Sequence, residues 1–266
     1  MTEPADPVSP TPAARPSRWP AVILGTLVTI FAFLAASFTA RNSDVWLHLA
    51  SGRLLAQGRY DFGVDPFAYT TDGVYWANQA WLFDLGLYAG FRAFGGTGLV
   101  VLKAAAVALL AALLLRLSRP RTSPGNSFWV ASASTLLAIL AMSPRLQLQP
   151  VSVSLLLLAV CLWLLRRGGR ALYALPAVVA LWVNLDTWFI LGPLLVTLFW
   201  LGQAFDRDRP DETRIPIWLL AACFAACLLS PHHVHALALP VELSPTVWRS
   251  ELAGDYRFAS DRKSVV

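Results

Sequence analysis

Charged residues are scarce in this chain of 266 residues: Asp, Glu, Lys and Arg make up 14% of it, against about 25% in an ordinary soluble domain. Hydrophobic residues make up 56%, and the mean hydropathy is +0.56. This composition excludes a disordered chain and argues against a soluble globular enzyme. Cysteine is also rare, and the three present, Cys161, Cys223 and Cys227, all lie inside apolar stretches. An odd number of cysteines outside loops does not indicate a disulfide framework.

The sequence also lacks the short motifs of several common enzyme classes. It contains no Gly-rich phosphate-binding loop, no HExxH zinc motif and no nucleophile elbow. The net charge is +5, from 21 Lys and Arg against 16 Asp and Glu. A basic chain can indicate a nucleic-acid partner, but here the charges lie in short clusters between apolar runs, which is typical of membrane topology. We therefore expect a lipid bilayer, and no nucleic acid, as the partner.

Long apolar runs dominate the chain. Seven of them lie roughly at 20–40, 97–116, 128–143, 150–165, 171–187, 188–204 and 215–230. A helix of about 20 apolar residues crosses a hydrocarbon core about 30 Å thick. The runs are continuous rather than alternating, which favours helices over a closed barrel. The sequence thus predicts an all-α, polytopic membrane helix bundle of about seven transmembrane helices, unless the fifth and sixth runs form one unit bent near Asp186.

The other segments define the predicted organisation. Residues 1–19 contain five prolines among Ala and Ser and predict a disordered cytoplasmic tail. Residues 20–230 are expected to form the transmembrane domain, whose first run is longer than the apolar part of a signal peptide and so favours an uncleaved helix. This domain includes a large outer loop at 41–96. Residues 231–266 are expected to form an extracytoplasmic C-terminal segment.

Basic residues indicate the orientation. With a cytoplasmic N-terminus, one side of the membrane receives four groups of arginines, at 15–18, 116–121, 166–170 and 207–214, whereas the short loops opposite contain Arg145 and little else. This distribution follows the positive-inside rule. The sequence therefore predicts a multi-pass protein of the inner (plasma) membrane with its N-terminus in the cytoplasm.

The long outer loop contains two amphipathic stretches, at 45–57 and 76–94. We expect both to lie along the outer membrane face, with Asp84 and Arg92 away from the apolar side of the second one. A packed, partly inserted helix is the alternative for the second stretch. Because a long ordered loop in a compact protein is usually functional, this loop is where we expect the site.

Titratable residues gather on the predicted outer side, which carries all four histidines and the five aspartates of the loop. Asp44 follows the first span closely, and a carboxylate at the mouth of a cavity can accept a proton from an incoming hydroxyl. His48 lies one turn further on, so that the pair could hold a phosphate, a metal or an acceptor. The alternative role for Asp44 is to cap the helix that begins there.

Three further charges stand at or near membrane depth. Lys103 lies in the outer third of the second span, where snorkelling to the surface is the alternative to a functional role. Arg145 is the one basic residue of a short outer loop, which a phosphate-binding role would explain, as would an interface anchor. Asp186 is expected either to face a cavity or to lie in a short outer turn.

Two loop residues complete the candidates. Asp65 precedes a proline and predicts a turn followed by an extended segment. His232 begins the sequence His-His-Val-His, which can bind zinc, although a zinc site usually needs ligands from elsewhere as well. A solvated loop is the alternative, so we assign no metal site and no certain cofactor, and leave a divalent metal open.

Several of these residues, taken in order, resemble the first outer loop of bacterial multispanning glycosyltransferases of the GT-C type. The sequence Asp44-Val-Trp-Leu-His48-Leu followed by Gly52 is similar to their D-x-W-W-H-L…G motif. The sequence Asp65-Pro-Phe-Ala-Tyr-Thr70 is similar to D-P-F-S-Y-T, and the stretch from Trp76 to Trp81-Leu resembles W-x-x-H-E-W-L.

The resemblance continues more loosely through residues 20–250. Pro144-Arg145-x-Gln147 resembles an Arg-Pro-Gln corner, Trp182-Val-Asn-Leu-Asp resembles W-x-N-x-H-G, and Ser230-Pro231-His232 resembles N-P-x-G. The sequence departs from the family pattern at Gln79-Ala80, where relatives have His-Glu, and at Asp186-Thr187, where they have His-Gly. GT-C enzymes also generally have more than seven spans. These departures suggest a truncated or degenerate member.

The resemblance implies a cavity facing the periplasm of a bacterium, a polyprenyl-phosphate-linked sugar as donor, and an inverting transfer in which Asp44 serves as catalytic base or positions the acceptor. It implies that the donor phosphate or substrate is bound by residues from His48, Asp65, Lys103, Arg145, Asp186 and His232. Such a site requires that Asp44, His48 and Arg145 converge around an outward-opening cavity. The alternatives are a non-catalytic membrane scaffold or a transporter subunit, although the sequence shows no internal repeat.

Overall fold

A computed structural model describes residues 19–39, 44–67, 75–118, 127–205 and 214–237. Within these ranges the chain is all-α, and the extended pairing is limited to one isolated bridge between Gly63 and Trp76. The α-helices are α1 (Trp19–Ala36), α2 (Asp44–Ala56), α3 (Trp81–Leu117), α4 (Ser127–Met142), α5 (Pro150–Arg167), α6 (Leu175–Trp182), α7 (Leu191–Phe205) and α8 (Ile217–Ala226). Short 3-10 segments at Ser143–Arg145, Gly169–Ala174 and Thr187–Ile190 connect some of them.

Five helical segments of the described residues are long and apolar enough to cross a membrane. They are Trp19–Ala36, Trp81–Leu117, Phe128–Arg145, Pro150–Arg167 and Thr187–Phe205. The apolar runs at 171–187 and 215–230 form shorter helices, within Gly169–Trp182 and Ile217–Ala226. The structure therefore confirms an all-helical chain with the composition and helix lengths of a multi-pass membrane protein.

The helix α3 joins two elements that the sequence predicts as separate. It contains most of the amphipathic stretch at 76–94 and the whole second apolar run, and it bends at Gly95, whose φ of 67° and ψ of −171° are not helical. A positive φ is accessible to glycine without steric cost, which is why the bend falls here. Residues 76–80 precede the helix rather than belonging to it. The first amphipathic stretch agrees closely with α2.

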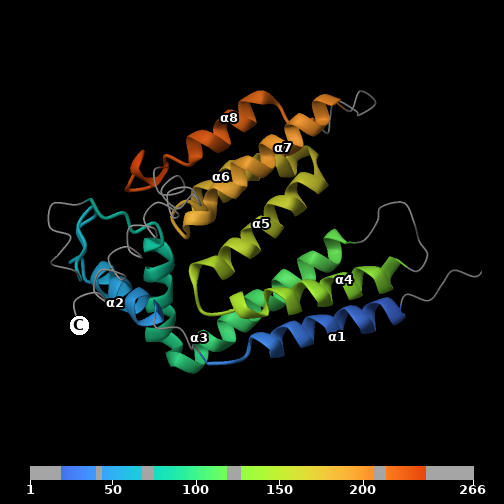
Figure 1. Cartoon of the computed structure of the whole chain (residues 1–266), viewed down its shortest axis with the longest axis horizontal. Helices are drawn as coiled ribbons and strands as arrows, with labels where there is room; N and C mark the ends of the chain where they lie inside the picture. The colour runs from blue at the N-terminus through green and yellow to red at the C-terminus, as the bar shows by residue number, and fades with distance from the viewer. Residues whose placement is uncertain (1–18, 40–43, 68–74, 119–126, 206–213, 238–266) are drawn as a thin grey trace, which may run out of the picture.

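Figure 1 shows two groups of helices with α5 between them. Helices α1 and α4 pack beside the part of α3 that follows Gly95, whereas α6, α7 and α8 pack together on the other side of α5. Small residues form much of the first contact, among them Ala32, Ala36 and Ala104, and they let the helix backbones approach closely. Large side chains such as Trp182 and Phe189 fill the second group.

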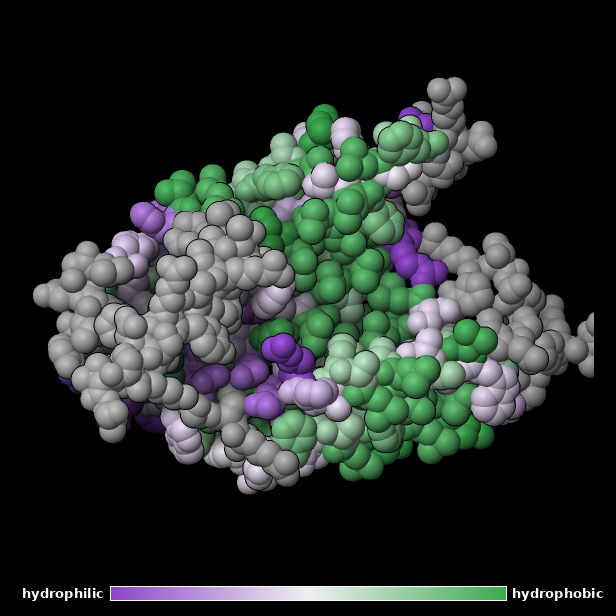
Figure 2. All heavy atoms as spheres, in the orientation of Figure 1, coloured by the Kyte–Doolittle hydropathy of each residue, from purple (hydrophilic) through white to green (hydrophobic). Residues whose placement is uncertain are grey.

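The helix α2 and residues 81–94 of α3 lie together at one end of the bundle (Figure 1), which we call the α2 end. Hydrophobic residues cover the flanks of the long helices, and hydrophilic residues gather toward the α2 end (Figure 2). Arg116 and Arg167 occupy the last turns of α3 and α5, whose C-terminal ends face away from α2. Several other arginines of the predicted cytoplasmic clusters, and nearly all of the predicted tails at 1–19 and 231–266, lie outside the described residues.

A close approach between α2 and α3 depends on Gly52. A Cβ atom at this position would lie 2.1 Å from the backbone oxygen of Asp84 and 2.8 Å from the Cβ of Tyr88. No side chain fits such a space without displacing one of the two helices. Gly52 therefore sets the distance at which side chains of α2 meet those of α3.

Candidate functional site

A buried carboxylate, Asp84, holds the α2 end together from the first turn of α3. It is 1% exposed, its Oδ1 lies 2.6 Å from Nδ1 of His48, and its Oδ2 accepts a hydrogen bond from the amide of Asn78 at 2.8 Å. The prediction that Asp84 lies away from the packed side of an amphipathic helix is wrong. Its partner His48 comes from another helix 36 residues earlier, and the helical pattern of residues 76–94 carries no information about it.

Asp44 is the first residue of α2 and is exposed. Its Oδ2 accepts a hydrogen bond from the side-chain amide of Gln149, with a donor–acceptor distance of 3.3 Å. His48 lies one turn along the same helix but directs its ring to Asp84 and meets the ring of Phe83 edge-on, at 5.3 Å between centroids. The two residues of the predicted Asp44–His48 pair thus have different partners.

A cavity of about 240 Å³ lies between α3 and the segment that leads into α5. We call it the Lys103 cavity. Its wall is mostly apolar, and its polar lining residues are Lys103, Gln147, Gln149 and Ser152. Because Gln149 both lines the cavity and binds Asp44, the Asp44 carboxylate stands at the rim. The lining also includes Phe83, which contacts His48.

Lys103 is buried rather than snorkelling to the surface. The residue is 5% exposed, its ammonium donates a hydrogen bond to the backbone oxygen of Phe38 at 2.9 Å, and it lies 3.6 Å from the centroid of the Phe38 ring. An ammonium carries three N–H donors. The contact with Phe38 satisfies one of them, and the rest can serve an anion in the cavity.

Arg145 and Asp65 lie outside this cavity. Arg145 is exposed on the 3-10 segment before Gln147, and its backbone oxygen accepts a hydrogen bond from Ser152. Asp65 forms the predicted turn, in which its side chain accepts a hydrogen bond from the backbone N–H of Phe67 at 2.9 Å. The predicted extended segment after this turn lies mainly outside the described residues.

Asp186 lies in the turn between α6 and α7 and is buried there. Its carboxylate accepts hydrogen bonds from the hydroxyl of Ser154 at 2.5 Å and from the backbone N–H of Thr187 at 2.8 Å. The indole N–H of Trp182 donates to the same Ser154 hydroxyl at 2.6 Å. Asp186 therefore ties the turn to α5, and the neighbouring Leu185 lines the Lys103 cavity.

His232 fastens the segment after α8 to the loop before α3. It is 1% exposed, with Nδ1 3.0 Å from the hydroxyl of Tyr75 and Nε2 3.0 Å from the backbone oxygen of Asn78. A carbonyl can only accept, so Nε2 carries the proton and Nδ1 accepts from the tyrosine. Burial lowers the pKa of His232, the nearby His235 and His233 add to this effect, and the hydrogen bond to Asn78 opposes it.

We expect the protein to lose stability in acid through His232. Because its pKa is lower in the folded state, the unfolded chain binds a proton first, and the stabilisation that is present above about pH 6.5 is lost as the pH falls. The contribution of this residue to the slope of the free energy of unfolding against pH is at most about 1.4 kcal/mol per pH unit. Thermal unfolding of purified protein between pH 7.5 and 5 measures it. A His232→Gln variant should show a shallower decline, and an equal decline in both proteins would contradict the assignment.

Several residues of the α2 end escape sequence reasoning. Asn78 bridges Asp84 and His232, and Gln79 is buried with its amide N–H donating to the backbone oxygen of Ala236 at 2.6 Å. The side-chain oxygen of Gln79 has no hydrogen-bond partner among the described residues. Ser154 is one of two serines, with Ser152, in the apolar run at 150–165, and a hydroxyl within that run was the available signal. Asn78 and Gln79 gave none, because their contacts with His232 and Ala236 join residues more than 150 positions apart.

The α2 end therefore combines an apolar cavity, a buried ammonium and amide donors, with an exposed carboxylate at its rim. Of the predicted site residues, Lys103 lines the cavity and Asp44 binds Gln149 of its lining. The predicted convergence of Asp44, His48 and Arg145 around one cavity is not seen, because His48 binds Asp84 and Arg145 lies outside the lining. Asp65 forms a turn of the outer loop, and His232 binds the loop before α3. Among the described ranges, no three His, Cys, Asp or Glu side chains are arranged to hold a metal ion. Comparison of the chain with protein-family models, curated proteins and solved structures finds no match.

Proposed function

We propose that the chain is a membrane glycosyltransferase-like protein that transfers a sugar from a polyprenyl-phosphate donor to an acceptor at the outer face of a bacterial inner membrane. The observation that carries this proposal is the Lys103 cavity, which combines apolar walls with a buried cation and has Asp44 at its rim. The resemblance of the first outer loop to GT-C enzymes supports the same reaction.

The donor phosphate fits the polar lining of the cavity. The Lys103 ammonium supplies the opposite charge in a region of low dielectric, where an ionic interaction is much stronger than in water. The amides of Gln147 and Gln149 can donate to the remaining phosphate oxygens. Apolar walls, formed by residues such as Leu87 and Leu102, suit the first isoprenoid units.

The transfer requires a base for the acceptor and a cation for the leaving group. The acceptor hydroxyl attacks the anomeric carbon, its proton passes to Asp44, and the bond between that carbon and the phosphate oxygen breaks with inversion. Lys103 stabilises the charge left on the polyprenyl phosphate. Asp44 suits the role of base because it is exposed to an incoming acceptor, whereas Asp84 and Asp186 are buried.

The proposed topology has seven spans, a cytoplasmic N-terminus and residues 41–96 outside. It counts the two shorter helical segments, Gly169–Trp182 and Ile217–Ala226, as spans beside the five longer ones. The directions of the helices support this topology. The helix α2 lies at one end of the bundle, and Arg116 and Arg167 occupy helix ends that face away from α2.

Replacement of Lys103 by Met is expected to weaken binding of polyprenyl phosphate about tenfold or more, because the phosphate loses its ionic partner while the length of the side chain is kept. Displacement of a fluorescent polyprenyl phosphate from detergent-solubilised protein measures the affinity. Arg92→Gln is the matched control, since Arg92 is an exposed cation on the same helix outside the cavity lining. Equal affinities of all three proteins would show that the phosphate does not bind in this cavity.

Turnover tests the function itself. Purified full-length protein is incubated with a panel of polyprenyl-phosphate sugars, and released polyprenyl phosphate is measured. Release from one class of donor supports the proposal. Donor binding without release from any donor overturns the enzymatic function and favours the non-catalytic scaffold.

A further inference from the structure

A second cavity at the α2 end is lined by two arginines. It has a volume of about 450 Å³, lies between α2 and residues 81–94 of α3, and is lined by Arg53 and Arg59 together with aromatic side chains such as Tyr88 and Phe67. We call it the arginine cavity. None of its lining residues is acidic. The cavity therefore presents a positive lining without a matching negative charge.

Both guanidinium groups are available to a ligand. Arg53 lies in the last turn of α2, Arg59 follows the helix, and both residues are exposed. Within the part of the chain that the structure describes, neither side chain has an ion-pair or hydrogen-bond partner. A guanidinium presents N–H donors in a planar fork that matches two oxygens of a phosphate. Two such groups on one cavity favour a phosphate over an anion that offers only one acceptor atom.

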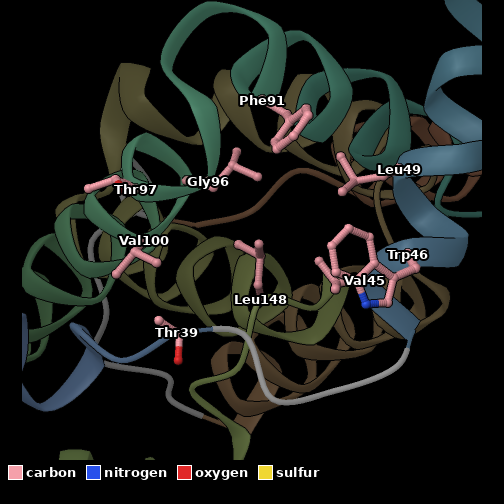
Figure 3. A pocket seen from close by; sticks show the side chains of 10 residues that line it. Thr39, Val45, Trp46, Leu49, Phe91, Gly96, Thr97, Val100 and Leu148 are labelled. Atoms are coloured by element: carbon pink, nitrogen blue, oxygen red, sulfur yellow. The ribbon is translucent and has the colours of Figure 1, made fainter.

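The arginine cavity adjoins an apolar cavity of about 300 Å³. Trp46, Leu49 and Phe91 line both, so the two form neighbouring parts of one groove. Figure 3 shows the apolar cavity, with Trp46 and Leu49 projecting from α2 toward Phe91 of α3 and with Leu148 facing them. Its polar lining side chains are the hydroxyls of Thr39 and Thr97 and the indole of Trp46. The groove thus has a cationic end and an apolar end.

We propose that this groove binds an anionic phospholipid, with the phosphate of the headgroup on Arg53 and Arg59 and an acyl chain in the apolar cavity. A free phosphate ion would use the arginines and leave the apolar cavity without a role, which is why the lipid is the better fit. Trp46 and Phe91 are 70% and 40% exposed, as expected for aromatic residues at a membrane interface.

This lipid site is distinct from the proposed donor site. Leu99 and Leu148 line both the apolar cavity and the Lys103 cavity, so they form the wall between them. Lys103 is not part of the groove lining. Binding of the phospholipid therefore stands or fails independently of sugar transfer.

Native mass spectrometry of the full-length protein in detergent tests the proposal. The protein is titrated separately with phosphatidylglycerol, with phosphatidylcholine, and with phosphatidylglycerol in the presence of inorganic phosphate. We expect phosphatidylglycerol to bind in preference to phosphatidylcholine, and the double variant Arg53→Gln, Arg59→Gln to weaken its binding tenfold or more. Arg167→Gln, Arg170→Gln removes the same charge from other exposed arginines, outside the groove, and should retain the affinity.

The site would be overturned by equal binding of the two lipids, by equal losses in the two double variants, or by displacement of phosphatidylglycerol by inorganic phosphate at a comparable concentration. The variant Arg53→Lys, Arg59→Lys keeps both charges but not the planar forks. It should recover part of the lost affinity, which distinguishes loss of binding from loss of folding, and unchanged thermal unfolding of the Gln variant provides a second check. No recovery in a folded Lys variant would show that charge at the two positions does not support binding, contrary to the proposal.

Discussion

Replacement of Asp44 by Asn is expected to lower the rate of sugar transfer about 100- to 10,000-fold, the range that loss of a general base usually produces. The amide oxygen of Asn can still accept the hydrogen bond from Gln149, so the rim of the Lys103 cavity should keep its structure. What the variant loses is the ability to take a proton from the acceptor hydroxyl. The donor should therefore bind with nearly unchanged affinity while its turnover falls.

The measurement is the release of polyprenyl phosphate by the native protein and the variant under saturating donor. Asp61→Asn is the control, because Asp61 is an exposed aspartate of the same outer loop that does not line the Lys103 cavity. The control should retain the native rate. Equal release by the native protein and the Asp44→Asn variant would remove Asp44 from the role of base, even if other variants confirm the donor site.

Replacement of Asp84 by Ala is expected to lower the free energy of unfolding by about 3 kcal/mol, because it leaves His48 and Asn78 without their common partner in a buried site. The same change at exposed Asp61 should cost less than about 0.5 kcal/mol. Unfolding of detergent-solubilised protein by denaturant provides both values.

A double-mutant cycle identifies the interaction responsible. His48→Ala alone should also destabilise the protein, and the two changes together should cost less than the sum of the single changes, because both remove one contact of 2.6 Å. Strict additivity would show that the contact contributes no stability, and the role of Asp84 as the central group of the α2 end would then be wrong.

The helices were the most predictable part of the fold. Their hydrophobicity is a property of about 20 consecutive residues, and no distant contact is needed to recognise it. The stretch at 76–94 and the run at 97–116 are predicted as separate elements, and in α3 the helical backbone is interrupted between them at Gly95. The limit of this signal appears in α6. The run at 171–187 gives only a short α-helix, α6, preceded by a 3-10 segment.

The candidate site was predictable only in part. The sequence predicted a cavity formed around Asp44, His48 and Arg145, with Lys103 as a further candidate. In the structure Lys103 lines a cavity and Asp44 binds Gln149 of its lining, whereas His48 binds Asp84 and Arg145 lies outside the lining. The sequence did not indicate that the ammonium of Lys103 would bind the backbone oxygen of Phe38. It also did not indicate that Asn78 would donate a hydrogen bond to Asp84. Contacts of this kind depend on which helices pack together.

The sequence by itself determined that the chain is helical, that it is built for a membrane and where its charges cluster, because each of these properties is local along the chain. The tertiary structure alone decided which carboxylate is buried and which is exposed. Asp44 and Asp84 follow similar local patterns at helix starts, but Gly52 lets α2 approach α3 so closely that His48 meets Asp84. Burial of one acid and exposure of the other follow from this packing, and so does the division of roles between them.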